Sequence, residues 1–240
     1  MKKIKFSNVL EWENFTKKNN LTKYLHNIKY IHLKKALDKL NLKTIRILDI
    51  GCGFADTFNL LNQCYQIEYL GIEDNYNIFT ETQKRYANFK NFNLENQNIL
   101  KSKFLNNKYD IIIMFDVLEH INLDERFNLL KNIKKTNFSK LFINVPNEVG
   151  FSIFLKNFGS MIMGYNRYKE YNTSETFNSL FGNIEKFPPH IDQHKGFDWK
   201  VLKYMLHYFY EINKISTIAS SLVPKNFSPS IFFECNKRLD

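Results

Sequence analysis

The 240-residue sequence contains little cysteine and no long apolar run. Its three cysteines, Cys52, Cys64 and Cys235, form neither a metal-ligand spacing nor an even set for disulfide pairing. This scarcity excludes a disulfide-rich secreted scaffold and indicates reduced thiols. No apolar stretch approaches the roughly 18 residues of a membrane span, and the basic start lacks the apolar core of a signal peptide. We therefore expect a cytoplasmic protein without a membrane span.

Internal repeats and low-complexity linkers are also absent from the sequence. A chain of this length can bury one sizeable core, so we expect a single domain over residues 1–240. Apolar strands alternate with helical patterns, which predicts a parallel α/β sheet covered on both faces. The net charge is +10, but the lysines are scattered in short pairs. We therefore favour a compositional origin of this charge over a dedicated nucleic-acid surface.

The run ILDIGCGFAD, residues 47–56, predicts a short apolar strand that contains Asp49 and leads into a Gly-x-Gly turn. Glycine is needed at such a turn because a Cβ would obstruct both the backbone dihedrals and the close approach of a ligand. A dinucleotide fingerprint would have a small residue at position 56, where Asp56 would instead bring a carboxylate near pyrophosphate. The turn therefore indicates a nucleoside-bearing cofactor other than a dinucleotide.

Polar residues follow the next expected strands. Glu73 ends a second strand and suits two ribose hydroxyls, because an ionised carboxylate can accept both hydrogen bonds; the alternative is a solvated acid. Asn98 lies in a polar loop, where an asparagine is often an ordinary turn residue. The run YDIIIMF, residues 109–115, predicts a strand buried on both faces, and ligands bind where such strands end.

Two motifs carry a family resemblance. The pattern Asp49-x-Gly51-x-Gly53-x-Ala55 resembles the first motif of class I S-adenosylmethionine (SAM)-dependent methyltransferases, with Ala55 replacing the usual third glycine. The run DVLEH, residues 116–120, resembles the fourth motif of a branch with ubiquinone-pathway O-methyltransferases and many small-molecule and sugar methyltransferases. The resemblance implies a Rossmann-like α/β fold. Its sheet would have seven mostly parallel strands with helices on both faces and a lid insertion after strand 5.

The same resemblance implies how the chain is organised around SAM and its product S-adenosylhomocysteine (SAH). We expect an N-terminal helical cap over 1–43, a SAM-binding core over 44–147, a lid over 148–189, and a C-terminal helix with strands over 190–240. The implied cofactor-binding residues are Asp49, Gly51, Cys52, Gly53, Glu73, Asp74, Asn98, Ile99 and Phe115. Of these, the resemblance places Asn98 beside the adenine amino group. We also expect Gly51→Val to abolish SAM binding while leaving a folded protein.

Histidines are the candidates for proton handling. His194 or His120 could accept the proton of a hydroxyl acceptor, because the reference pKa of histidine is about 6.5; His194 could instead brace the following helix. Four residues, Asp116, Glu119, His120 and His194, also resemble the metal-binding arrangement of small-RNA 2′-O-methyltransferases, and such a set suits a divalent ion. Most members of the broader branch carry Leu-Glu-His without metal, so we do not favour a divalent metal here.

The segment between residues 147 and 188 is rich in aromatic residues, and we interpret it as a lid that shapes the acceptor pocket. The alternatives are a helical hairpin that seals the core and a homodimer interface.

The preferred function is methyl transfer from SAM to a hydroxyl or amine of a small polar acceptor. A sugar, a nucleotide-activated sugar or a surface-glycan precursor of polysaccharide biosynthesis fits the resembled branch. The alternatives are a metal-assisted RNA 2′-O-methyltransferase and a non-catalytic SAM-binding scaffold.

Overall fold

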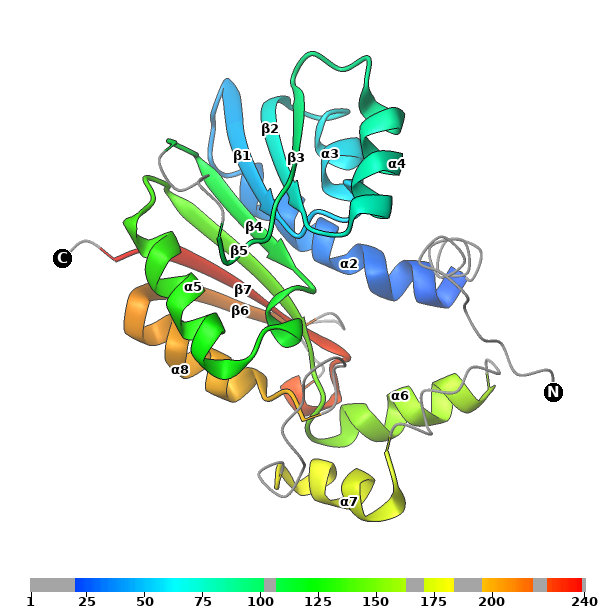
Figure 1. Cartoon of the computed structure of the whole chain (residues 1–240). Coiled ribbons are helices and arrows are strands. Elements are labelled where there is room, and N and C mark those ends of the chain that lie inside the picture. Colours follow the sequence, from blue (N-terminus) through cyan, green and yellow to red (C-terminus); the bar gives the residue numbers. More distant parts are fainter. Residues whose placement is uncertain (1–19, 102–106, 163–170, 184–195, 218–223, 239–240) are drawn as a thin grey trace.

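A seven-stranded sheet forms the centre of the computed structural model, which describes residues 20–101, 107–162, 171–183, 196–217 and 224–238 (Figure 1). Along the sheet the order is β3-β2-β1-β4-β5-β7-β6. Neighbouring strands run parallel from β3 to β5, and β7 is antiparallel to both β5 and β6. The strands are β1 Thr44–Ile50, β2 Gln66–Glu73, β3 Phe92–Asn96, β4 Ile111–Phe115, β5 Lys140–Pro146, β6 Tyr210–Thr217 and β7 Ser230–Lys237. The predicted seven-stranded, mostly parallel sheet is confirmed.

Helices cover both faces of this sheet. The α-helices are α2 Asn20–Leu37, α3 Asp56–Leu61, α4 Tyr76–Tyr86, α5 Leu123–Lys135, α6 Phe151–Ile162, α7 Thr173–Phe181 and α8 Trp199–Phe209, with 3₁₀ turns η2 Leu118–His120 and η5 Lys225–Phe227. Successive side chains of a buried strand point to opposite faces of the sheet, so alternate residues pack against the helices on each face. Ile111 and Ile113 pack in the cluster with α2 and α3, whereas Ile112 and Met114 pack in the cluster with α5 and α8. The run of isoleucines in β4 is thus explained by burial on both sides.

The helices α6 and α7 follow β5 and belong to the segment predicted as a lid (Figure 1). The buried carboxylate of Glu148 connects α6 to the segment just before α7. It accepts hydrogen bonds from Lys156 Nζ at 2.9 Å and from the Tyr171 hydroxyl at 3.0 Å. Aromatic side chains remain exposed on both helices, among them Phe154, Phe158, Phe177 and Phe181. None of the described helices combines the length and apolar character that crossing a membrane would require.

Candidate functional site

The glycine turn after β1 has the strained geometry that its sequence predicts. Gly51 and Gly53 have φ angles of +69° and +56°, in the left-handed region that glycine adopts without steric cost. Their segment is tied to the end of β2, because the N–H groups of Gly51 and Cys52 donate to the carbonyl of Ile72 at 2.8 and 3.0 Å. Ala55 is also left-handed, with φ +55° and ψ +40°. Alanine therefore adopts the backbone conformation that the usual third glycine would adopt more easily.

The two glycines of the turn face different surroundings. A Cβ on Gly51 would lie 2.5 Å from Val117 Cγ2, which is inside van der Waals contact. A Cβ on Gly53 would meet nothing within 4 Å. The expectation that Gly51→Val leaves a folded protein stays a prediction, but the new side chain would collide with the segment after β4, so we expect a loss of stability. Gly53 is the glycine that leaves room for a ligand.

Glu73, at the end of β2, holds the glycine turn through its carboxylate. Oε2 accepts from the Gly53 N–H at 2.9 Å, and Oε1 accepts from the Asn75 N–H at 2.9 Å. Burial raises the pKa of this carboxyl, while the two backbone N–H groups oppose that shift. Each carboxylate oxygen can accept a second hydrogen bond, so the two backbone contacts are compatible with a ribose ligand. The predicted ribose contact remains a prediction.

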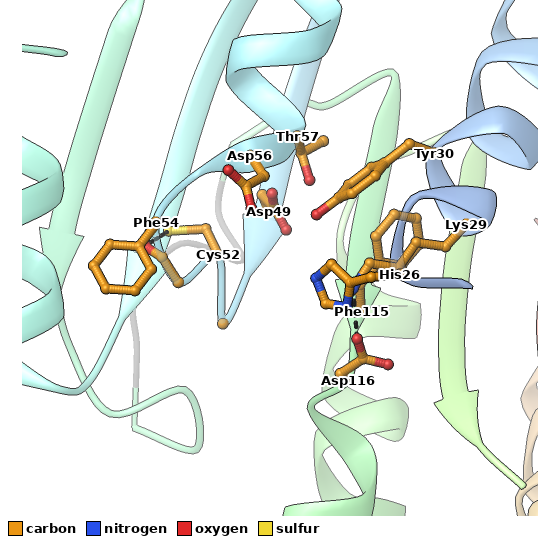
Figure 2. Close-up of a pocket in the computed structure, with 12 residues that line it drawn as sticks. His26, Lys29, Tyr30, Asp49, Cys52, Phe54, Asp56, Thr57, Phe115 and Asp116 are labelled. Carbon is orange, nitrogen blue, oxygen red and sulfur yellow. Dashed lines mark hydrogen bonds and ion pairs between the residues drawn. The ribbon is translucent and has the colours of Figure 1, made fainter. Parts of the chain in front are cut away.

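A cavity of about 180 Å³ lies beside the glycine turn (Figure 2). Three segments line it: α2, the run from β1 to the start of α3, and the end of β4. The lining residues are His26, Lys29, Tyr30, Asp49, Gly51, Cys52, Gly53, Phe54, Asp56, Thr57, Phe115 and Asp116. Five of the predicted cofactor residues therefore surround one cavity: Asp49, Gly51, Cys52, Gly53 and Phe115. The sulfur of Cys52 packs over Gly71, where a Cβ would lie only 2.7 Å from it.

Two carboxylates at this cavity have fixed partners within the protein. Asp49 is 2% exposed and accepts a 2.7 Å hydrogen bond from the Tyr69 hydroxyl. Burial raises the pKa of Asp49 to about 6, although the Tyr69 hydrogen bond opposes the shift. Asp116 has a φ of +57° and pairs with the ammonium of Lys29, and its other oxygen accepts from Asn144 Nδ2 at 2.7 Å. Burial would raise the pKa of Asp116, but the Lys29 charge outweighs it and lowers that pKa.

The wall contributed by α2 was not identified residue by residue from the sequence. Lys29 is 4% exposed, and its ammonium lies 5.3 Å from the ring centroid of Tyr30 and 5.7 Å from that of Phe115. Burial raises the pKa of Tyr30, and the charges of Asp56, Asp49 and Asp116 raise it further. The sequence contained one general signal, the expectation that the N-terminal helix covers the cofactor. The structure adds the side chains with which this helix reaches the cavity.

The remaining predicted cofactor residues lie outside the lining of this cavity. The Asn98 side chain accepts from the Leu100 N–H at 2.9 Å, as expected of a turn residue. Ile99 packs partly buried against the core that includes α5 and α8. Asp74 is exposed just after β2, and its carbonyl accepts from Asn96 Nδ2 at 3.1 Å. Their proposed contacts with the adenosine end of the cofactor are not tested by these positions.

The predicted proton-handling and metal residues are only partly described. His120 lies on η2, its side chain is 46% exposed, and burial lowers its pKa although Asp116 opposes this. Its Nε2 lies 4.0 Å from Glu119 Oε1. Burial, followed by the charge of Asp116, raises the pKa of Glu119 well above its ordinary value. His194 lies outside the described residues. Within the described ranges, no three His, Cys, Asp or Glu side chains are grouped to hold a metal.

The sheet order, the left-handed turn and the cavity at the strand ends define the fold of class I SAM-dependent methyltransferases. Residues 48–136 match a protein-family model described as a methyltransferase domain. This part of the chain is therefore similar to a methyltransferase domain.

Comparisons with individual proteins agree with this fold. The SAH-bound magnesium protoporphyrin IX methyltransferase from Synechocystis PCC 6803 superposes with a TM-score of 0.62 at 15% identity, over 96% of each chain. The methyltransferase domain of bacterial CtHen1 superposes with a TM-score of 0.59 at 16% identity, over 88% of this chain and 99% of that one. An uncharacterised protein of Methanocaldococcus jannaschii is 33% identical over 112 residues, which cover 45% of this chain and 44% of the relative. The match thus spans less than half of that curated relative.

Proposed function

We propose that the protein transfers a methyl group from SAM to a hydroxyl or amine of a small polar acceptor. One observation carries this proposal: the turn at Gly51 and Gly53 is left-handed, fixed to β2, and opens on a cavity at the strand ends. Backbone bent in this way allows close approach of a nucleoside-bearing ligand. The match of residues 48–136 to a methyltransferase domain supports SAM as that ligand.

The charge around the cavity supports SAM over a dinucleotide. Asp49, Asp56 and Asp116 supply three carboxyl groups, and the Lys29 ammonium is paired with one of them. SAM carries a sulfonium and an ammonium, which opposite charges at short range stabilise. A pyrophosphate would instead face carboxylates, and like charges repel. The site therefore favours a cationic cofactor.

SAM supplies a methyl group activated by its sulfonium. The acceptor atom forms its bond to the methyl carbon as the carbon–sulfur bond breaks, and that electron pair passes to sulfur to give SAH. The protein must align the reacting atoms and exclude water. Phe115 and Tyr30 lie edge to face at 6.0 Å and form an aromatic side of the cavity.

A hydroxyl acceptor must also lose its proton. His120 is proposed as the acceptor of that proton, because burial lowers its pKa and keeps the imidazole neutral near pH 7. His194 is the alternative base proposed from the sequence. An amine acceptor would need only to arrive unprotonated.

We propose a sugar, a nucleotide-activated sugar or another glycan precursor as the acceptor, and the cytoplasm as the location. The acceptor proposal is supported by the resemblance of residues 116–120 to a branch that includes many small-molecule and sugar methyltransferases. The exposed aromatic side chains of α6 and α7 are proposed to shape the acceptor pocket, with a homodimer contact as the alternative use of this surface. Free cysteines at positions 52, 64 and 235 support a reducing compartment.

The proposed function can be tested by measuring SAH release from SAM with a panel of sugars and nucleotide sugars, in the presence of EDTA. We expect at least one of these acceptors to give turnover without metal, and His120→Ala to lower turnover on a hydroxyl acceptor while SAM binding is retained. Methylation of RNA ends that requires magnesium or manganese would instead support the RNA 2′-O-methyltransferase. SAH binding without turnover on any acceptor would support a scaffold.

A further inference from the structure

Most of the large apolar side chains of α6 face outward, while the inner side of the helix attaches it to the protein. On the inner side, Ser152 Oγ and Lys156 Nζ both donate to the Asn147 carbonyl, at 3.0 and 2.9 Å. The outward side chains recur at helical spacing and are exposed. They are Phe151, Phe154, Leu155, Phe158 and Met161. Helices of a globular protein ordinarily bury their apolar side, so α6 presents a surface that a partner can cover.

Helix α7 and the turn η5 extend this surface. Phe177 and Phe181 on α7 are 62% and 65% exposed, and their ring centroids lie 4.9 Å apart. A groove of about 570 Å³ joins α7 to α6, because Phe158 lines one side of it and Phe177 lines the other. Phe227 of η5 is also exposed, and its ring lies 5.0 Å from that of Phe151. We call these side chains, together with the outward side chains of α6, the outer apolar face; α6 and α7 project together at one end of the molecule (Figure 1).

Two exposed lysines border the outer apolar face. Lys225 lies on η5, two residues before Phe227. Lys200 belongs to the first turn of α8, and its Nζ lies 4.0 Å from the position that a Cβ on Gly182 would take. Gly182 is the residue that caps the C-terminal end of α7. Positive charge therefore stands at two points along the edge of the apolar side chains.

The acids described near this face are held by hydrogen bonds within the protein. Glu148 is buried and paired with Lys156. The carboxylate of Glu175 accepts from the Asn172 N–H at 2.8 Å, in the capping box of α7. Asp198 caps α8 and accepts from the N–H that follows Trp199, at 2.7 Å. In the described parts of α6, α7, η5 and the first turn of α8, the exposed charged side chains are thus lysines.

We propose that the outer apolar face docks on an anionic lipid bilayer, with α6 lying in the plane of the membrane surface. Helices bind at such surfaces when aromatic and aliphatic side chains enter the boundary between headgroups and acyl chains, and lysines attract anionic lipids. The net charge of +10 acts in the same direction. A second copy of the chain complements this face less well, because a symmetric contact would place one positively charged face against another.

This inference goes beyond the proposed function and does not depend on which acceptor is methylated. It assigns the protein a peripheral attachment, in which α6, α7 and η5 contact the lipid surface and the sheet stays in water. The charged rim would supply long-range attraction, and the apolar side chains would supply the contact that persists at high salt.

The test is co-sedimentation of the full chain with lipid vesicles. We expect binding to vesicles of equal parts phosphatidylglycerol and phosphatidylcholine, and much weaker binding to phosphatidylcholine alone. The double variant Phe154→Ser/Phe158→Ser should lower the partition coefficient on anionic vesicles roughly tenfold or more, because two large apolar side chains no longer enter the bilayer. Lys200→Gln/Lys225→Gln should lower it several-fold, and this loss should vanish on phosphatidylcholine.

Tyr204→Ser/Tyr208→Ser is the matched control, because these two exposed aromatic residues have the same spacing on α8 but lie outside the outer apolar face. Its partition coefficient should equal that of the wild type. Urea denaturation should show that all three double variants stay folded, since the substituted side chains are exposed.

Three results would overturn the inference: no binding of the wild type to anionic vesicles, equal binding of the wild type and Phe154→Ser/Phe158→Ser, or equal binding of the wild type to the two kinds of vesicle. A dimer detected by light scattering that Phe154→Ser/Phe158→Ser dissociates, without vesicle binding, would assign the face to a second copy instead. Vesicle binding by a chain that does not bind SAH would sustain this inference while the proposed function failed.

Discussion

The two walls of the cavity are built in different ways. The wall at the glycine turn is held through its own backbone N–H groups: those of Gly51 and Cys52 donate to the Ile72 carbonyl, and that of Gly53 donates to the Glu73 carboxylate. The wall between α2 and β4 is held by side chains, chiefly the pair of Lys29 with Asp116 across 87 positions of sequence. The first wall depends on glycine at particular backbone positions, and the second depends on charge. Substitutions should therefore damage the two walls through different mechanisms and to different extents.

The largest effect is expected at the backbone wall, from Gly51→Val. The φ of +69° is unfavourable for a β-branched residue, and the new Cβ would lie 2.5 Å from Val117 Cγ2. Backbone strain and overpacking together should lower the free energy of unfolding by about 2–5 kcal/mol. Urea denaturation measures this change. Gly53→Ala is the matched control, since its Cβ meets no atom within 4 Å; it should cost about 1–2 kcal/mol from backbone strain alone. Equal losses in the two variants would contradict the packing against Val117.

Asp49, buried between the walls, should make stability depend on pH. Its pKa is about 6 in the folded protein, against an ordinary value of 3.8. Because the folded state binds this proton more tightly, the associated stability is present below pH 3.8 and is lost as pH rises through 6. Relative to Asp49→Asn, the wild type should lose about 2 kcal/mol of unfolding free energy between pH 4 and pH 7. Urea denaturation of both proteins across this range tests the prediction, and a difference that stays constant with pH would contradict it.

The side-chain wall should respond to Lys29→Met, which removes the ammonium from Asp116. The Lys29 side chain is 5% exposed but that of Asp116 is 34% exposed, so water compensates for part of the lost pairing. We expect a loss of about 1–3 kcal/mol in unfolding free energy, below the cost of breaking a fully buried pair. Lys34→Met provides the control, because Lys34 lies on the same helix and forms an exposed pair with Asp38, just past the end of that helix. The stability of this variant should match that of the wild type. Equal stability of Lys29→Met and the wild type would show that the pair of Lys29 with Asp116 does not stabilise the packing of α2 beside the end of β4.

The smallest effect is expected from Ala55→Gly. Glycine would relieve the cost of a left-handed alanine, roughly 1–2 kcal/mol. It would also remove a buried methyl group and increase the entropy of the unfolded chain, which together offset about 1–2 kcal/mol. The unfolding free energy should therefore change by less than about 1 kcal/mol. A loss above about 2 kcal/mol would show that the methyl group packs more tightly than its burial alone indicates.

The contrast between the walls also explains what the sequence could predict. The backbone wall is encoded locally: an apolar strand, two glycines and a carboxylate at the end of the next strand form a pattern that can be read directly. The alternation of apolar segments likewise predicted the parallel sheet, because strands buried on both faces need continuous apolar residues, as in Ile111–Phe115. These parts of the fold depend on short-range spacing.

The side-chain wall could not be predicted in this way. No local pattern relates Lys29 to Asp116, because their contact exists only when α2 packs beside the end of β4. The collision of a Gly51 side chain with Val117 was missed for the same reason, since it joins the ends of two strands. Asp56 was recognised as unfavourable for a dinucleotide, but the α2 residues that line the same cavity could not be placed from the sequence.

The most direct test of the central claim is a calorimetric titration of the purified chain with SAH, with NAD as the control ligand. The geometry of the glycine turn and the carboxylates around the cavity predict saturable binding of SAH at one site per chain, without added metal, and no heat of binding for NAD. Absence of SAH binding, or binding of NAD in its place, would contradict the assignment of this cavity to SAM.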